Sequence, residues 1–104
     1  MADEYKGHYT YSKKVIGEWN SDDIGVYYCG FKLDNGNLKP LYIGKGIGDG
    51  GIRSRLLDHL SEDHWPDVTH FGYRVCDNAT EAENFEAEEI DRCKPKYNDV
   101  QPRI

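Results

Sequence analysis

A glycine-rich segment in the middle of the chain is flanked by basic side chains. Five glycines fall between positions 44 and 51, and Lys45, Arg53 and Arg55 stand among or soon after them. Glycine lets a backbone approach a ligand closely, and the N–H groups at the start of a following helix attract negative charge. This combination predicts an anion site, and a phosphate is the first ligand to consider.

These glycines also permit other interpretations. The run Gly46–Gly51 fits the dinucleotide-binding pattern G-x-G-x-x-G, and Asp77 ends a later apolar run where a ribose-binding carboxylate would sit. That fold needs more βαβ units than this chain can hold, and no Lys-Ser or Lys-Thr follows the glycines as a Walker loop requires. A flexible loop with solvated basic residues is the remaining alternative.

The residues after the glycines have helical spacing from Ile52 to Leu60. The leucines of this segment would lie on one side, whereas Arg55 and His59, four residues apart, would share a neighbouring stripe and could act on one object. Arg53 points toward the leucine side by the same count, although a side chain in the first turn has freedom to splay. The alternative for Arg55 and His59 is a solvated polar face, the usual place for such residues.

A second helix is predicted to begin at the capping box Thr80–Glu83 and to end at Cys93, about thirteen residues on. Glu86 would stand in the middle of its apolar stripe, within about 40° of Ala82 and Ile90 on a helical wheel. A carboxylate on a buried side is costly unless it is paired or binds a metal. Glu86 is therefore either half of a structural ion pair with an arginine or a metal ligand.

Before the glycines, two segments rich in β-branched and aromatic residues, Gly25–Phe31 and Leu41–Ile43, are separated by a turn cluster at 34–37. This pattern predicts an antiparallel hairpin. Tyr27 and Tyr42 would lie far from its turn and project from the same region of the sheet. The glycine loop then follows the second arm of a hairpin rather than the first strand of a parallel sheet, which disfavours the dinucleotide interpretation.

The rest of the chain predicts one more strand and a weakly defined beginning. Alternating apolar residues indicate a third strand at Thr69–Cys76. Tyrosines at positions 5, 9 and 11 permit one strand near the N-terminus, and Lys13–Trp19 permits one or two helical turns. We therefore expect an N-terminal extension over residues 1–24 and a domain over residues 25–104.

Composition limits the classes of protein to which the chain can belong. Its 104 residues suffice for one domain, and it has neither an apolar run long enough to span a membrane nor the apolar start of a signal peptide, so a cytoplasmic protein is expected. The net charge is −6, yet residues 25–60 carry five basic and three acidic groups, which permits a phosphate-binding face. The three cysteines are widely spaced and lack a C-x-x-C pair, so buried thiols are expected rather than disulfides or a zinc site.

Six features in order resemble one known family. The triplets Gly25-Val26-Tyr27 and Tyr42-Ile43-Gly44 are similar to the two signature triplets of the GIY-YIG nuclease superfamily. The run 55–59 resembles the family's R-x-x-x-H helix, Glu86 its metal-binding glutamate and 95–98 its closing P-x-Y-N, and Glu86 lies nine residues before the proline as in the excision-repair branch. The resemblance covers about residues 25–99. Valine replaces isoleucine in the first triplet, the triplets are farther apart, and the glycine-rich stretch is additional, but no functional side chain is lost.

The resemblance implies a small α/β (α+β) domain, with a three-stranded antiparallel sheet flanked by helices, that hydrolyses DNA phosphodiester bonds with one divalent cation. Glu86 would hold Mg²⁺ or Mn²⁺, hard cations that prefer oxygen ligands. Arg55 would clamp the phosphate in the transition state. Lys45, Arg53 and the loop N–H groups that begin at Gly44 would position the DNA strand.

The resemblance also assigns roles to the remaining polar residues. Tyr27 would take the proton of the attacking water, which a phenol with a pKa near 10 does only beside a group that favours the phenolate, such as the metal or Lys45. Tyr42 would orient the water or the phosphate, and His59 would assist proton transfer or bind a phosphate oxygen. Asn98 would support the site from the end of the chain.

A second class of function stays open. A GIY-YIG-like module could bind nucleic acid or a protein partner without cutting. The presence of Tyr27, Tyr42, Arg55, His59 and Glu86 together favours the enzyme, whereas the acidic charge of the chain weighs against strong DNA binding. In either case a second copy of the chain or a partner protein would supply specificity, because the sequence has no room for an added DNA-binding domain.

Overall fold

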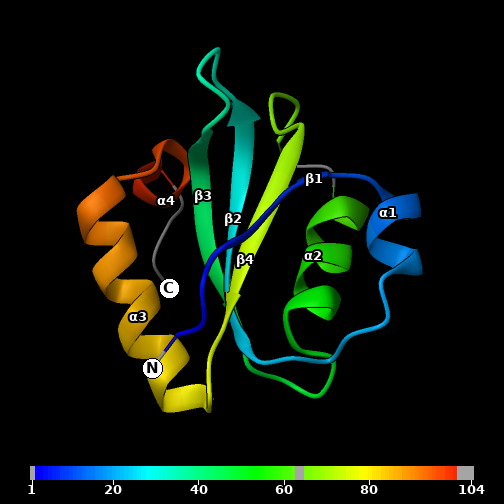
Figure 1. Ribbon diagram of the computed structural model, residues 1–104, viewed down its shortest axis with the longest axis vertical. Helices are drawn as coiled ribbons and strands as arrows, with labels where there is room; N and C mark the ends of the chain where they lie inside the picture. Colours follow the sequence, from blue (N-terminus) through cyan, green and yellow to red (C-terminus); the bar gives the residue numbers. More distant parts are fainter. Residues whose placement is uncertain (1, 63–64, 101–104) are drawn as a thin grey trace.

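A four-stranded antiparallel sheet separates two layers of helices (Figure 1). The computed structural model describes residues 2–62 and 65–100. The strand order is β1-β4-β2-β3. In chain order the elements are β1 (Lys6–Thr10), α1 (Lys13–Glu18), β2 (Gly25–Lys32), β3 (Leu38–Gly46), α2 (Gly51–Glu62), β4 (His70–Val75), α3 (Ala79–Cys93) and α4 (Lys96–Val100).

Each face of the sheet has its own hydrophobic core, and β2 contributes to both by simple alternation. Tyr27 and Cys29 pack in the core that includes Ile16 of α1 and Leu56 of α2. Their chain neighbours, such as Tyr28, pack in the core that includes Ala82 of α3. Because successive side chains of a strand point to opposite faces, the run of buried residues in β2 fills both layers.

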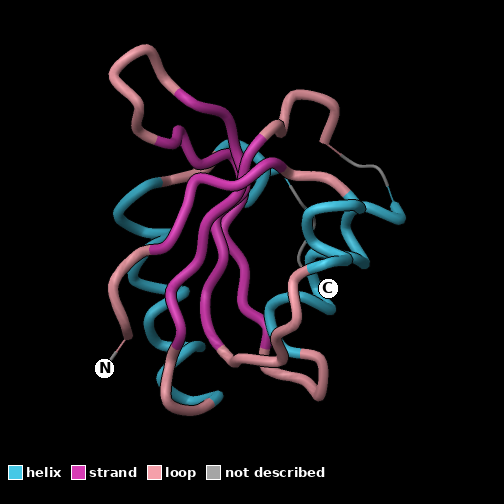
Figure 2. Tube along the Cα trace, turned by 45° about the vertical axis from the view of Figure 1, so that its right-hand side comes forward, coloured by secondary structure: helices cyan, strands magenta, loops and turns pink. Residues whose placement is uncertain are grey.

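The predicted hairpin is confirmed, and both of its arms are longer than expected. β2 and β3 pair antiparallel from Gly25 opposite Gly46 to Lys32 opposite Leu38. Their turn projects from the end of the sheet (Figure 2). β4 pairs with the other side of β2 and forms the expected third strand.

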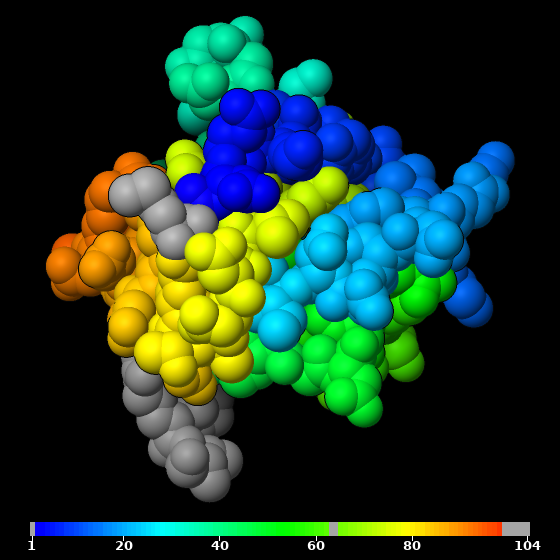
Figure 3. All heavy atoms as spheres, turned by 60° about the horizontal axis from the view of Figure 1, so that its bottom comes forward, coloured from blue at the N-terminus to red at the C-terminus, as the bar shows by residue number. Residues whose placement is uncertain are grey.

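The prediction of three strands is wrong, because the N-terminal segment adds a fourth. β1 pairs with the outer edge of β4, with Tyr9 opposite Phe71 and an irregular register between Lys6 and Tyr9. Figure 3 shows this segment lying over β4. Residues 1–24, expected to be an extension, thus include an edge strand and a helix that pack into the same unit. The reason is that β4 would otherwise present an unpaired edge.

The helices begin at positions that local chemistry explains. α2 starts at Gly51, whose φ of 61° suits glycine, and where a Cβ would collide with the Asp22–Asp23 backbone. The predicted start of α3 at Thr80 is wrong, since the N-cap is Asn78, whose side chain accepts a hydrogen bond from the backbone N–H of Glu81. Asparagine competes well with threonine for this position.

The cysteines are thiols rather than disulfides in the described residues. All three cysteines are free thiols; Cys29 and Cys76 are buried, and Cys93 is half-buried. No helix in residues 2–62 and 65–100 is long and apolar enough to cross a membrane.

The outer edge of β3 is closed by a side chain from α4. The Asn98 amide donates to the carbonyl of Ile43 at 2.9 Å and accepts from the N–H of Ile43 at 2.8 Å. Ile43 is fully buried, so its edge-facing backbone groups need these partners. Asn98 therefore stands in for a neighbouring strand at this position.

We expect Asn98→Ala to lower the free energy of unfolding by about 1–3 kcal/mol, because it leaves two backbone groups of Ile43 without partners. Urea unfolding followed by circular dichroism measures this loss. Asn84→Ala, at an exposed position on α3, is the control and should unfold like the parent. Equal unfolding midpoints for the two variants would contradict the role given to Asn98.

Candidate active site

Residues from four elements and one loop line a pocket of about 240 Å³ at the sheet edge formed by β3. We call it the β3 pocket. It lies where α2, packed on one face of the sheet, and α3, packed on the other, both reach this edge strand. Its lining residues are Tyr27, Tyr42, Lys45, Ile47, Gly48, Arg55 and Glu86.

Strand register places the two tyrosines together. Tyr27 lies opposite Gly44 and Tyr42 lies opposite Cys29, so both phenols project from one face of the hairpin. Their ring centroids are 6.2 Å apart. A Cβ at Gly44 would collide with the Tyr27 hydroxyl, so the missing side chain leaves the space that this hydroxyl occupies. Gly44 thus shapes the pocket from within the sheet.

The Tyr27 hydroxyl is hydrogen-bonded to Nε2 of His59 at 2.8 Å. Both side chains are buried, with exposed fractions of 1% for Tyr27 and 5% for His59. His59 therefore does not lie on a solvated face of α2, as one alternative had it. Arg55, one turn earlier, does reach the pocket, where its guanidinium contacts Asp58 at 3.2 Å.

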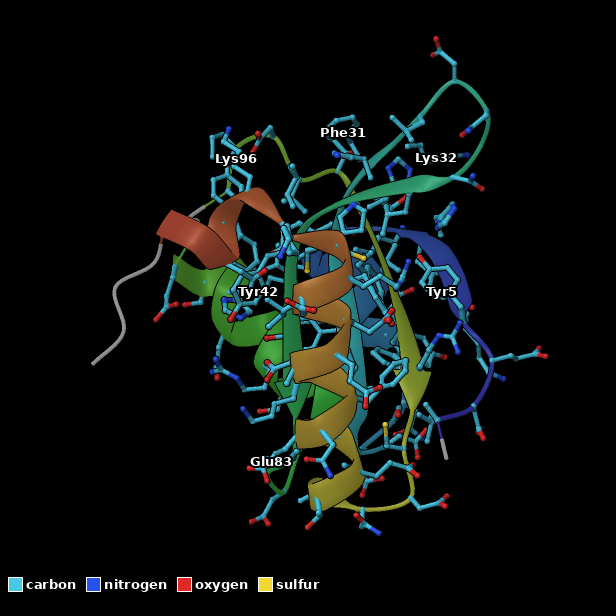
Figure 4. All side chains as sticks on the ribbon, turned by 90° about the vertical axis from the view of Figure 1, so that its left-hand side faces the viewer. Tyr5, Phe31, Lys32, Tyr42, Glu83 and Lys96 are labelled. Carbon is cyan, nitrogen blue, oxygen red and sulfur yellow. The ribbon has the colours of Figure 1, made fainter. Side chains whose placement is uncertain are left out.

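Alternation along β3 sends Lys45 the other way, toward α3. Its ammonium contacts a carboxylate oxygen of Glu86 at 3.3 Å, and the exposed fractions of the two side chains are 34% and 17%. Glu86 is thus on the inner side of α3 and paired, but with a lysine rather than the expected arginine. Figure 4, which looks onto α3, labels Tyr42 at the side of this helix. Glu83 lies near the first turns of the helix, well away from Tyr42.

Four of the expected site residues are absent from the lining of the β3 pocket: Gly44 and His59, which lie against Tyr27, and Arg53 and Asn98. Arg53 donates from Nε to the carbonyl of Ile16 at 3.1 Å and from a terminal nitrogen to that of Gly17 at 2.9 Å. It therefore neutralises the carbonyl end of α1 and ties α1 to α2. Asn98 is engaged with the backbone of β3, as described above.

Burial keeps the pocket phenols protonated. Desolvation raises the pKa of Tyr27 well above 10.0, and the neighbouring Tyr42 adds to the shift, while Arg55 opposes it. Desolvation also raises the pKa of Tyr42, and the Glu86 carboxylate adds to this shift. Tyr27 at rest is therefore a neutral phenol in a dry setting rather than a phenolate.

Two further residues contribute that sequence reasoning missed. Trp65 is buried and lies against both Tyr42 and His59, with ring centroids 4.7 Å and 4.4 Å away. Glu89 is buried on α3, where it accepts hydrogen bonds from the Tyr28 hydroxyl at 2.7 Å and from Arg92. The i,i+3 spacing of Glu89 and Arg92 was a visible signal, whereas nothing local marked Trp65.

The pocket offers a single carboxylate to a metal ion. No group of three or more His, Cys, Asp or Glu side chains in the described residues could hold one. Mg²⁺ commonly binds through one or two carboxylates together with substrate phosphate oxygens and retained waters. Glu86 beside an open space fits that pattern, and it does not fit a metal cage made by protein alone.

Comparison with models of known protein families, with curated proteins and with solved structures finds no match for this chain.

We expect the stability of the fold to decline as the pH rises above about 10, the usual pKa of an exposed phenol in the unfolded chain. The pKa values of Tyr27 and Tyr42 are raised in the folded state, so the unfolded state releases these protons first and unfolding is favoured. Urea midpoints and tyrosinate absorbance across this range test it. A midpoint that stays constant well above pH 10 would contradict the burial assigned to these phenols.

Proposed function

We propose that this protein is a divalent-metal-dependent endonuclease that hydrolyses DNA phosphodiester bonds in the β3 pocket. One observation carries the proposal: two tyrosines, two cations and one acid, spread over sixty positions of the chain, converge on one small space. Together with His59, which is hydrogen-bonded to Tyr27, they supply a proton-transfer pair, positive charge for a phosphate and an oxygen ligand for a cation, the parts that phosphodiester hydrolysis needs. The GIY-YIG-like motifs supply an independent expectation for the same residues.

The substrate phosphate is bound by the pocket cations. Arg55 reaches the pocket from α2 and Lys45 from β3, so they approach a bound phosphate from different elements. Arg55 presents a planar pair of donors that match two phosphate oxygens, and Lys45 adds a point charge. Both stabilise the charge that grows on the phosphate oxygens as the attacking water adds.

Proton transfer runs through Tyr27 to His59. Because burial keeps Tyr27 protonated, it cannot remove a proton from water unless it gives up its own. The hydrogen bond to Nε2 of His59 provides that path. The water proton passes to the Tyr27 oxygen and the Tyr27 proton passes to His59, while the water oxygen bonds to phosphorus. The bond from phosphorus to the leaving oxygen breaks, and that oxygen takes a proton from solvent.

The remaining residues hold this arrangement. Tyr42 lies beside both partners of the proton path, with its ring centroid 5.2 Å from that of His59, and its hydroxyl orients water or phosphate. Glu86 would hold Mg²⁺ or Mn²⁺, which when bound stabilises the charge on the phosphate and on the leaving oxygen. Surfaces outside this pocket, a second copy of the chain or a partner protein would provide specificity for a DNA structure or sequence.

Incubation with supercoiled, branched and single-stranded DNA tests the proposal. We expect cutting with Mg²⁺ or Mn²⁺, none with a chelator, and a decline as salt rises, because salt screens the contacts between the pocket cations and the phosphates. Glu86→Gln should lower the cutting rate about a thousandfold or more. In the presence of a chelator, the variant should bind DNA at least as well as the parent, because it removes a negative charge next to the phosphate.

The matched control is Glu83→Gln, which makes the same change at an exposed position of α3 away from the pocket. It should cut like the parent. Stability should change by less than about 1 kcal/mol in both variants, since the Lys45 ammonium left by Glu86→Gln reaches water. Normal cutting by Glu86→Gln would end this mechanism, and DNA binding without cutting by the parent would support the non-cutting module instead.

Tyr27→Phe and Tyr28→Phe form a second matched pair. Each removes one buried hydroxyl that makes a hydrogen bond, to His59 and to Glu89 respectively, so similar losses of stability, about 1 kcal/mol, are expected. Only Tyr27→Phe breaks the proton path, and it should lower the cutting rate by about a hundredfold or more. Single-turnover cutting rates separate the two, and equal rates would contradict the face assigned to the reaction.

A further inference from the structure

The ion pair between Lys45 and Glu86 is the most shielded contact between opposite charges at the β3 pocket. Its partners are 34% and 17% exposed, whereas the other pocket cation, Arg55, pairs with an Asp58 side chain that is 57% exposed. Ion pairs weaken as water surrounds them, so the Arg55 pair is given up more easily than the Lys45 pair. The two pairs therefore present different obstacles to incoming ligands.

The Lys45 ammonium contacts one of the two carboxylate oxygens of Glu86. It lies 3.3 Å from Oε1, and Glu86 is the only acidic side chain among the residues that line the pocket. A divalent cation near that oxygen would be repelled by the ammonium and would have to displace it. Lys45 is half-exposed on a flexible stem, so it can leave when another anion offers it a contact.

We propose that Lys45 is a built-in competitor for the cation position on Glu86, so that a divalent cation binds tightly only after a substrate phosphate has drawn Lys45 away. Because the phosphate is assigned to DNA, the proposal rests on the function proposed above. The exchange is balanced in charge: the phosphate takes the ammonium from the carboxylate, and the carboxylate takes the metal ion. Thermodynamic linkage then requires the cation to strengthen phosphate binding by the same factor.

Lys45→Met tests the competition without any reaction. The substitution keeps an unbranched side chain of similar length and removes the ammonium. Binding of Mn²⁺ to the protein alone, measured from the spin-resonance signal of free Mn²⁺, should be tighter by about fivefold or more than in the parent, since displacing the ion pair is no longer required. Lys39→Met removes the same charge from an exposed position on the same strand and should bind Mn²⁺ like the parent.

Glu86→Gln identifies the ligand in the same titration. It should weaken Mn²⁺ binding in the parent and, more strongly, in the Lys45→Met background. Equal affinities of the parent and Lys45→Met would overturn the proposal. So would an equal gain in Lys39→Met, which would indicate net charge alone, or a gain that persists when Glu86 is replaced.

A second arm repeats the titration with a saturating DNA duplex in the Tyr27→Phe background, which slows hydrolysis. DNA should raise the Mn²⁺ affinity of this protein, and the rise should be smaller by about fivefold when Lys45→Met is added. An unchanged rise would overturn the coupling. Failure to bind or cut DNA would refute the proposed nuclease, whereas the titration without DNA would still decide whether Lys45 competes for Glu86.

Discussion

The pairing of β2 with β3 is the constraint on which the site depends. It sets Tyr27 opposite Gly44 and thereby decides both where the phenol points and why nothing larger than glycine fits across from it. A shift of register by one residue would turn Tyr27 toward α3 and away from His59. The hydrogen bonds of Asn98 to Ile43 hold the outer edge of β3. The last helix, α4, thereby stabilises the strand pairing that positions Tyr27.

β3 is the edge strand at this side of the sheet, so side chains from both faces of the sheet can line one pocket at its rim. Tyr42 and Gly44 face α2, Lys45 faces α3, and the pocket forms where these directions come together at the rim. This position explains the unequal burial within one site. The proposed proton-transfer pair Tyr27–His59 is buried, whereas the groups that would contact the phosphate, Arg55 and Lys45, reach solvent. Dry surroundings favour a short, directed proton path, and exposed cations favour a large charged substrate.

The acidic character of α3 has two separate consequences. Glu89 has a structural role. Its carboxylate accepts hydrogen bonds from Arg92 on the same helix and from Tyr28 of β2, and these hydrogen bonds hold its pKa below the usual value. Glu86, one turn earlier, lines the pocket and is paired with Lys45. Two acids three residues apart on one helix thus differ in role because one points toward the buried middle of the sheet and the other toward its edge.

Local pattern alone determined a large part of this protein. The hairpin, the helix after the glycine loop, the third strand and the stripe that carries Glu86 follow from alternation, turn residues and helical spacing, which act over a few neighbouring positions. The opposite orientations of Tyr27 and Tyr28 follow from the same alternation. The resemblance of the motifs named five residues that line the pocket, whereas four others that it named, Gly44, Arg53, His59 and Asn98, lie outside its lining.

Tertiary structure decided what local pattern could not express. β1 becomes a strand because β4 needs a partner on its outer edge, and its own short, polar sequence gives little sign of this. Lysine rather than arginine pairs with Glu86 because strand alternation and helix placement bring Lys45 across a separation of forty-one residues. Trp65 lies against Tyr42 and His59, although nothing in its local sequence marks these contacts. Contacts between distant segments depend on how whole elements pack, and a sequence records that packing only through the summed burial of many side chains.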